Sequence, residues 1–163
     1  MKRAVEVVLD SNVVNRISRD PTSPPSDRLS RAIASRRAQV CVDEARGIVD
    51  EWERTANREV VRQLIIHWQQ FKGWKLVALV RTLPPQVGRA LLQLRFRDTG
   101  DKLVLRTAYN TEDRRIVSDD PDFWDPRDVR RKGDPRAPVA TLCATQLGVT
   151  VQTLTAALAE LAP

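Results

Sequence analysis

The chain has 163 residues, of which 42% are hydrophobic, and it carries a formal net charge of +6. This length predicts one domain over residues 1–163 that buries about two-thirds of its unfolded surface, so no disulfide is needed for stability. No run reaches the ~20 apolar residues of a membrane span. Glu6 and Asp10 also interrupt the apolar start of the chain, so we expect no signal peptide. We therefore expect a soluble, cytoplasmic protein with no membrane partner.

Arginine far outnumbers lysine among the basic residues. Guanidinium groups make bidentate contacts with phosphate, and a basic surface attracts nucleic acid. Cys41 and Cys143 form no CxxC pair and have no neighbouring histidine, so we expect buried thiols and no zinc site. The single histidine, His67, falls inside a predicted helix without an obvious nucleophile, which gives little basis for a Ser-His-Asp triad.

Short apolar runs alternate with helical patterns along the chain. The predicted strands cover residues 4–9, 38–42, 74–80, 115–118 and 149–152. The predicted helices cover residues 12–18, 26–36, 45–71, 84–94, 102–110, 139–147 and 154–161. Loops rich in proline and aspartate are expected over Asp20–Ser26 and Asp122–Asp134. Alternation of this kind indicates a three-layer α/β/α sandwich around a mainly parallel sheet.

Acidic residues follow two of the predicted strands. Asp10 ends the first strand in VEVVLDSN, Asp120 and Asp122 follow the fourth in RIVSDDPDF, and Asp101 opens a helix. The carboxyl ends of parallel strands meet at one crevice, so we expect these carboxylates to lie close together. Two such charges ~4 Å apart repel by about 4 kcal/mol at an effective dielectric of about 20, and a divalent cation relieves that repulsion. Oxygen ligands favour Mg²⁺ or Mn²⁺ over zinc.

Each of these acids also has an ordinary structural explanation when taken alone. Asp10 and Asp101 could cap helices, and Asp120-Pro121-Asp122 could be a turn. The order and spacing of the acids carry the metal-site interpretation. A further acid stays open, because CVDEARGIVDEW offers four alternatives. These are Asp43, Glu44, Asp50 and Glu51. Glu44 and Glu51 are seven residues apart and share nearly one helix face, so spacing does not separate them.

The order of these motifs resembles the PIN-domain ribonucleases. The matching pieces are strand-Asp-Ser-Asn, a glutamate on the helix after the second strand, an aspartate opening a later helix, and strand-Ser-x-Asp-x-Asp-Phe. The resemblance covers residues 4–124 through motifs and reaches 163 through the helix–strand–helix ending; LDSN and IVSDDPDFW are its most specific parts. It implies a PIN-like fold and a Mg²⁺- or Mn²⁺-dependent endoribonuclease that hydrolyses single-stranded RNA.

The resemblance also implies roles for particular residues. It makes Asp10, Glu51, Asp101 and Asp120 the catalytic acids, and Asp10, Asp101, Asp120 and Asp122 the metal ligands. Asn12 and Ser118 match polar positions of the family beside the first and fourth acids, and we expect both to contact the substrate. We further expect Arg16, Arg106, Arg114 and the run Arg127–Lys132 to steer RNA, and Trp124 to stack on a base.

Many PIN domains are toxins of bacterial toxin–antitoxin pairs, and others act in phage defence or RNA processing. An antitoxin protein and a second copy of the chain are therefore further expected partners. The Asp20–Ser26 loop and the Trp124–Pro138 segment depart from a minimal toxin pattern. The alternative is a non-catalytic PIN-like module that binds RNA or protein. A haloacid-dehalogenase-type phosphatase is disfavoured, because it needs a second aspartate where Asn12 stands.

Overall fold

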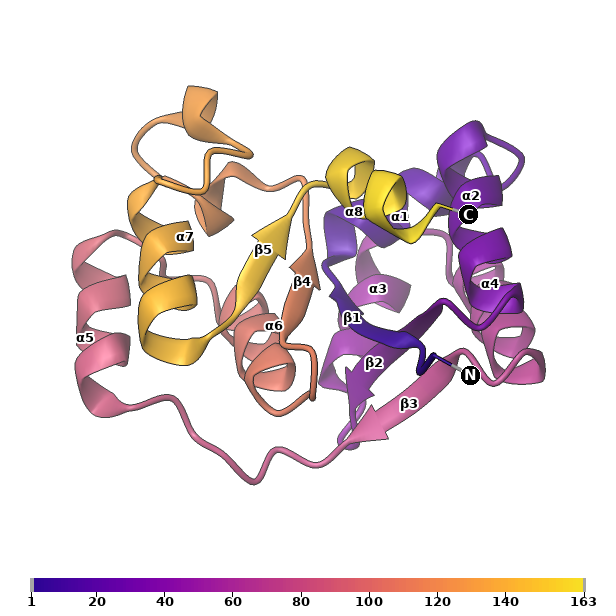
Figure 1. Cartoon of the computed structure of the whole chain (residues 1–163), viewed down its shortest axis with the longest axis horizontal. Helices are drawn as coiled ribbons and strands as arrows, with labels where there is room; N and C mark the ends of the chain where they lie inside the picture. Colours follow the sequence, from indigo (N-terminus) through magenta and orange to yellow (C-terminus); the bar gives the residue numbers. More distant parts are fainter. Residues whose placement is uncertain (1, 163) are drawn as a thin grey trace.

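The computed structural model describes residues 2–162 and contains one sheet of five parallel strands in the order β3-β2-β1-β4-β5. The strands are β1 (Val5–Leu9), β2 (Ala38–Asp43), β3 (Trp74–Val77), β4 (Arg115–Val117) and β5 (Thr150–Gln152). Helices flank this central sheet (Figure 1). The expected three-layer α/β/α architecture with a parallel sheet is confirmed.

Eight α-helices occur within the described residues. They are α1 (Ser11–Arg19), α2 (Pro24–Ala34), α3 (Gly47–Thr55), α4 (Arg58–Gln70), α5 (Pro85–Gln93), α6 (Thr99–Tyr109), α7 (Pro138–Leu142) and α8 (Leu154–Leu161). Single 3-10 turns occur at Pro121–Phe123 and Val129–Arg131, and a π-helical turn at Cys143–Leu147 extends α7. α6 contacts β1, β2 and β4, whereas α2 contacts β2 and packs against α8.

The middle of the sheet is buried on both faces, as its uninterrupted apolar sequence predicts. Val7, Val8 and Leu9 of β1 are each at most 1% exposed. Both cysteines are buried, as expected, and burial raises the pKa of each thiol to about 12. No helix within residues 2–162 has both the length and the apolar character to cross a membrane.

The predicted helix over residues 45–71 is wrong, because the structure has two helices there. α3 ends at Thr55, Ala56 is extended, and α4 begins at Arg58. The Asn57 side chain causes the restart by accepting a hydrogen bond from the backbone N–H of Val60 at 3.1 Å. The break lets α3 and α4 pack on each other through Trp52 and Trp68, whose rings meet edge-on at 6.2 Å.

Other boundaries also differ from the sequence prediction, and three of them have a clear structural cause. β3 ends at Val77 and not at residue 80, because Val77 pairs with Asp43, the last residue of β2. α2 begins at Pro24, inside the expected loop, because proline suits the first turn of a helix. α6 begins at Thr99, three residues before the predicted start, because Asp98 caps it.

Candidate metal centre

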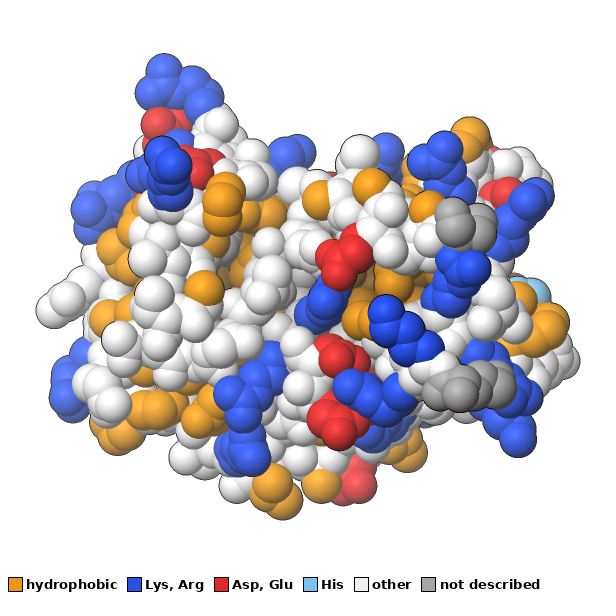
Figure 2. Space-filling view, viewed as in Figure 1, with side chains coloured by type: hydrophobic (Ala, Val, Ile, Leu, Met, Phe, Trp, Pro, Cys, Tyr) orange, Lys and Arg blue, Asp and Glu red, His pale blue; other side chains and the backbone are white. Residues whose placement is uncertain are grey.

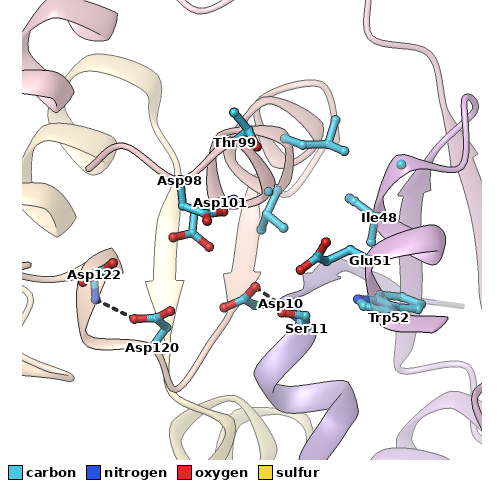
Figure 3. A pocket seen from close by; sticks show the side chains of 14 residues that line it. Asp10, Ser11, Ile48, Glu51, Trp52, Asp98, Thr99, Asp101, Asp120 and Asp122 are labelled. Carbon is cyan, nitrogen blue, oxygen red and sulfur yellow. Dashed lines mark hydrogen bonds between the residues drawn. The ribbon is translucent and has the colours of Figure 1, made fainter. Parts of the chain in front are cut away.

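The order of the strands reverses between β1 and β4. From β1 the chain adds β2 and β3 on one side, then returns to add β4 and β5 on the other. Ligands of open α/β folds bind in the crevice that such a reversal leaves at the carboxyl ends of the strands. Asp10 directly follows β1, and Asp120 lies three residues after β4. Together with α3 and α6 they line a cavity of about 430 Å³ (Figure 3).

Three carboxylates meet in this cavity, as their order in the sequence predicts. One oxygen from each of Asp10, Asp101 and Asp120 lies within 4.8 Å of the other two. Asp98, Asp122 and Glu51 line the same cavity around them (Figure 3). Between residues 2 and 162, no lysine or arginine nitrogen lies within 4.0 Å of the three central carboxylates; the nearby ion pairs go to their neighbours Asp119 and Glu51. The centre of the cavity therefore carries acidic groups without an ion-pair partner.

Hydrogen bonds from the ends of β1 and β4 hold Asp10 in place. Its Oδ1 accepts from the backbone N–H of Ser11 at 2.7 Å, and its Oδ2 accepts from the Ser118 hydroxyl at 2.7 Å. The same hydroxyl oxygen accepts from the backbone N–H of Asp120 at 3.0 Å. Asn12 donates to Ser118 at 3.4 Å and accepts from the backbone of Asp119 at 3.1 Å. These bonds tie the first acid to the loop that carries the third.

Ser118 and Asn12 therefore lie beneath the acids. Ser118 is 0% exposed, so its hydroxyl cannot contact a substrate from solvent. Asn12 is half-buried, and both the nitrogen and the oxygen of its amide form hydrogen bonds with the loop after β4. Burial thus excludes Ser118 as a substrate contact and gives it a positioning role. Asn12 also holds the loop after β4, and its contact with a substrate stays a prediction.

The start of α6 supplies a fifth aspartate of the cavity, which sequence reasoning missed. Asp98 is the N-cap of α6, and its Oδ1 accepts from the backbone N–H of Asp101 at 3.1 Å. Because Asp98 does the capping, the carboxylate of Asp101 is free to point into the cavity (Figure 3). The signal was the spacing Asp-x-x-Asp, in which the first residue suits an N-cap and the second the first turn.

Burial and mutual repulsion raise the pKa values of these acids. The pKa of Asp101 rises to about 8, first through burial and then through the charges of Asp10, Asp120, Asp98 and Asp122. Burial raises the pKa of Asp10 to about 6, although Ser118 and Ser11 donate to it. The pKa of Asp122 is also raised, by burial first and then by Asp120 and Asp98. A bound divalent cation would lower these pKa values, because it favours the ionised carboxylates.

The donor set fits a hard divalent cation. Among residues 2–162, the charged residues that line the cavity are all carboxylates, and neither cysteine nor histidine lines it. Mg²⁺ and Mn²⁺ prefer such oxygen ligands, whereas zinc prefers nitrogen and sulfur. Asp10, Asp101 and Asp120 could hold one ion directly.

The four acids around α3 separate in the structure. Glu51 lines the cavity, whereas Glu44 and Asp50 are exposed outside it. Asp43 accepts from the backbone N–H groups of Gly47 and Ile48 at 2.9 and 2.8 Å and so fixes the start of α3. Glu51 forms an ion pair with Arg54.

A close approach of α3 to α6 brings Glu51 to the cavity. A Cβ atom at Gly47 would lie 2.5 Å from a terminal methyl group of Leu103 on α6, so the Leu103 side chain would have to move if residue 47 carried one.

The expected substrate contacts are distributed differently. Arg16 is exposed and pairs at 3.1 Å with Asp119, the residue before Asp120. Arg106 points away, because its guanidinium donates to the backbone oxygen of Leu79 at 2.9 Å. The prediction that Trp124 stacks on a base is wrong, because its ring is buried in the core at 1% exposure.

The remaining arginines of the expected RNA path are also occupied. Arg114 lies 5.2 Å over the ring of Tyr109 and donates to the backbone oxygen of Leu147 at 2.9 Å. In the run Arg127–Lys132, Arg130 pairs with Asp128 at 2.9 Å. Neither Arg114 nor this run lines the acidic cavity, which is closed by α3, α6 and the loops after β1 and β4.

No protein-family model matches the chain, and none of the curated proteins matches it.

Proposed function

We propose that this protein is a cytoplasmic, Mg²⁺- or Mn²⁺-dependent endoribonuclease that hydrolyses phosphodiester bonds in single-stranded RNA, with a PIN-like active site. The observation that carries the proposal is the set of three carboxylates, from Asp10, Asp101 and Asp120, with oxygens within 4.8 Å of one another. Their place at the strand-order reversal, where α/β folds bind ligands, supports an active site.

The chemistry divides between the ion and the side chains. A bound Mg²⁺ or Mn²⁺ supplies positive charge for the scissile phosphate and lowers the pKa of a water molecule. Asp10 and Asp120 present their oxygens in a fixed arrangement because Ser118 bonds to both residues. Asp101 adds a third oxygen from the rigid first turn of α6. Glu51, at the wall formed by α3, can accept a proton or orient a water molecule.

The charge of the protein supports a polyanionic substrate. The protein carries a net charge of +6, so the acidic cavity is set in a molecule that attracts polyanions. Arg16 and Arg54 hold positive charge next to the acids through Asp119 and Glu51. Within this class we propose the toxin of a toxin–antitoxin pair or a phage-defence nuclease as the biological role. A small antitoxin gene beside the coding sequence would support the toxin.

The test is cleavage of labelled single-stranded RNA by purified protein with Mn²⁺, Mg²⁺ or EDTA. Asp10→Asn removes a ligand charge while keeping the shape of the side chain, and we expect loss of activity by about a hundredfold or more. Glu59→Gln, an exposed change on α4, is the matched control and should cleave like the wild type. Equal cleavage by Asp10→Asn and the control, or binding of RNA without cleavage under every metal condition, would overturn the proposal.

A further inference from the structure

A second surface lies at the amino ends of the strands, whereas the acidic cavity lies at their carboxyl ends. A hollow of about 520 Å³ lies at the surface where α2 packs against the end of α8. A neighbouring hollow of about 440 Å³ shares Ser35, Arg37, Leu161 and Ala162 with it and reaches Val5 at the start of β1. We call the two together the α2–α8 groove. β1 separates it from the acidic cavity by its five residues, roughly 16 Å.

The rim of the α2–α8 groove is basic. Arg28, Arg36 and Arg37 have no carboxylate oxygen within 4.0 Å among residues 2–162, since the two acids of the groove are already paired. Asp27 pairs with Arg31, and Glu160 pairs with Arg115. Figure 2 shows blue side chains gathered around the ends of α2 and α8. The groove thus offers positive charge that no described group neutralises.

The floor is aliphatic, and backbone hydrogen bonds hold the loop beside it. Ala32, Leu158 and Leu161 line it with only 5–7% of each residue exposed, and the exposed Ala162 lies beside them. Among residues 2–162, no aromatic residue lines the groove. Single-stranded nucleic acid gains much of its affinity from aromatic stacking, which this floor cannot supply. The loop after α2 is fixed by backbone bonds from Arg36 to Ile33 and from Arg37 to Ala32, at 2.9 and 2.8 Å. An aliphatic floor with a cationic rim matches a ligand with apolar and acidic faces.

We propose that the α2–α8 groove binds an acidic amphipathic helix of a partner protein. Leucine-like side chains of the helix would lie on Ala162 and on the exposed parts of Leu158 and Leu161. Its carboxylates would pair with Arg28, Arg36 and Arg37. The two hollows share four lining residues and so adjoin each other, which fits a segment of chain better than a compact small molecule. Because the groove is at the amino ends of the strands, the partner would dock without covering the acidic cavity. This proposal does not depend on the nuclease activity.

The test uses two fluorescent peptides of about 18 residues, about five helical turns, with one composition. In one, leucine and glutamate form opposite helix faces; in the other, the order is scrambled. Fluorescence anisotropy measures binding to the wild type, to Arg28→Glu/Arg37→Glu, and to Arg19→Glu/Arg89→Glu. The last protein makes the same charge change at exposed sites outside the groove. Thermal unfolding of each variant serves as the check on folding.

We expect the amphipathic peptide to bind the wild type and the control variant alike, and the groove variant about tenfold or more weakly. The scrambled peptide should bind all three proteins weakly. The proposal is overturned if the amphipathic peptide does not bind, or if both double variants reduce binding equally. It is also overturned if the scrambled peptide binds as well, or if a labelled single-stranded RNA loses affinity in the groove variant alone.

Discussion

Ser118 connects two of the acids from below the cavity. Its hydroxyl donates to Asp10 and accepts from the backbone of Asp120, and the residue is fully buried. The sequence placed the central acids correctly because strand ends converge in a parallel sheet. It did not separate ligands from supporting residues, because both are small polar groups after strands. Trp124 was misjudged because proximity in sequence to Asp122 carries no information about the direction of its ring.

We expect Ser118→Ala to lower the rate of RNA cleavage about 10–100-fold, because Asp10 and the Asp120 backbone lose their shared partner. The Ser118→Ala variant should still fold, but it should bind Mn²⁺ more weakly than the wild type does. Ser18→Ala is the matched control, since Ser18 is also buried and donates to a backbone oxygen, that of Asn15, at 3.0 Å. Single-turnover cleavage with a Mn²⁺ titration measures both effects. Equal rates and Mn²⁺ dependence in the two variants would contradict a positioning role.

The acidic residue on α3 can be tested in the same assay. Glu51→Gln should reduce cleavage about tenfold or more, because Glu51 lines the cavity. Glu44→Gln should cleave at the wild-type rate, because Glu44 is exposed outside the cavity. The sequence could not choose between them, since the helix face depends on where α3 begins, and Asp43 sets that start. The reverse ranking of the two variants would show that the cavity has been assigned the wrong glutamate.

At the scale of elements, the alternation of strands and helices was predictable, whereas several boundaries were not. The apolar repeat from Ile48 to Leu64 predicts one helix, but Asn57 restarts the chain as a new one. The spacing of apolar residues shows which face of a helix is buried, but it does not show whether the helix axis changes direction. In the same way, Asp98 starts α6 earlier than the apolar pattern indicates. Single side-chain caps decided both boundaries.

The end of α4 offers a test of local strain. Lys72 has a φ of 56°, and Gly73 donates to the backbone oxygen of Trp68 at 2.8 Å, which is the geometry that favours glycine after a helix. We expect Lys72→Gly to stabilise the fold by about 1 kcal/mol, or about 2–4 °C in melting temperature. Lys72→Ala, which keeps the Cβ atom, should give no such gain. Similar melting temperatures for the two variants would contradict strain at this position.

For the whole molecule, the acidic cavity predicts that stability depends on pH and on metal. The folded-state pKa values of Asp10 and Asp101, about 6 and about 8, lie above the usual value near 3.9. The folded protein therefore binds more protons than the unfolded chain. The stability that these groups contribute is complete below about pH 4 and is lost as the pH rises through about 6 and 8.

Asp101→Asn isolates this effect. Without divalent ions, the variant and the wild type should melt at similar temperatures near pH 4, and the variant should melt higher near pH 8. Mn²⁺ at about 100 times its Kd should raise the wild-type melting temperature near pH 8 by about 5–10 °C, and that of the variant by much less. Differential scanning fluorimetry across pH measures both. A constant difference between the two proteins at every pH would contradict the repulsion among these carboxylates.

The central claim is that this cavity uses a divalent ion to hydrolyse RNA with water. Mass spectrometry of the products from a single-stranded RNA, cut by the wild type with Mn²⁺, tests it most directly. Attack by water leaves linear phosphate ends, whereas attack by the neighbouring 2′-hydroxyl leaves a 2′,3′-cyclic phosphate. We expect linear ends, formed with Mn²⁺ and abolished by EDTA. Cyclic phosphate ends, cleavage that persists in EDTA, or intact RNA with Mn²⁺ would contradict the account.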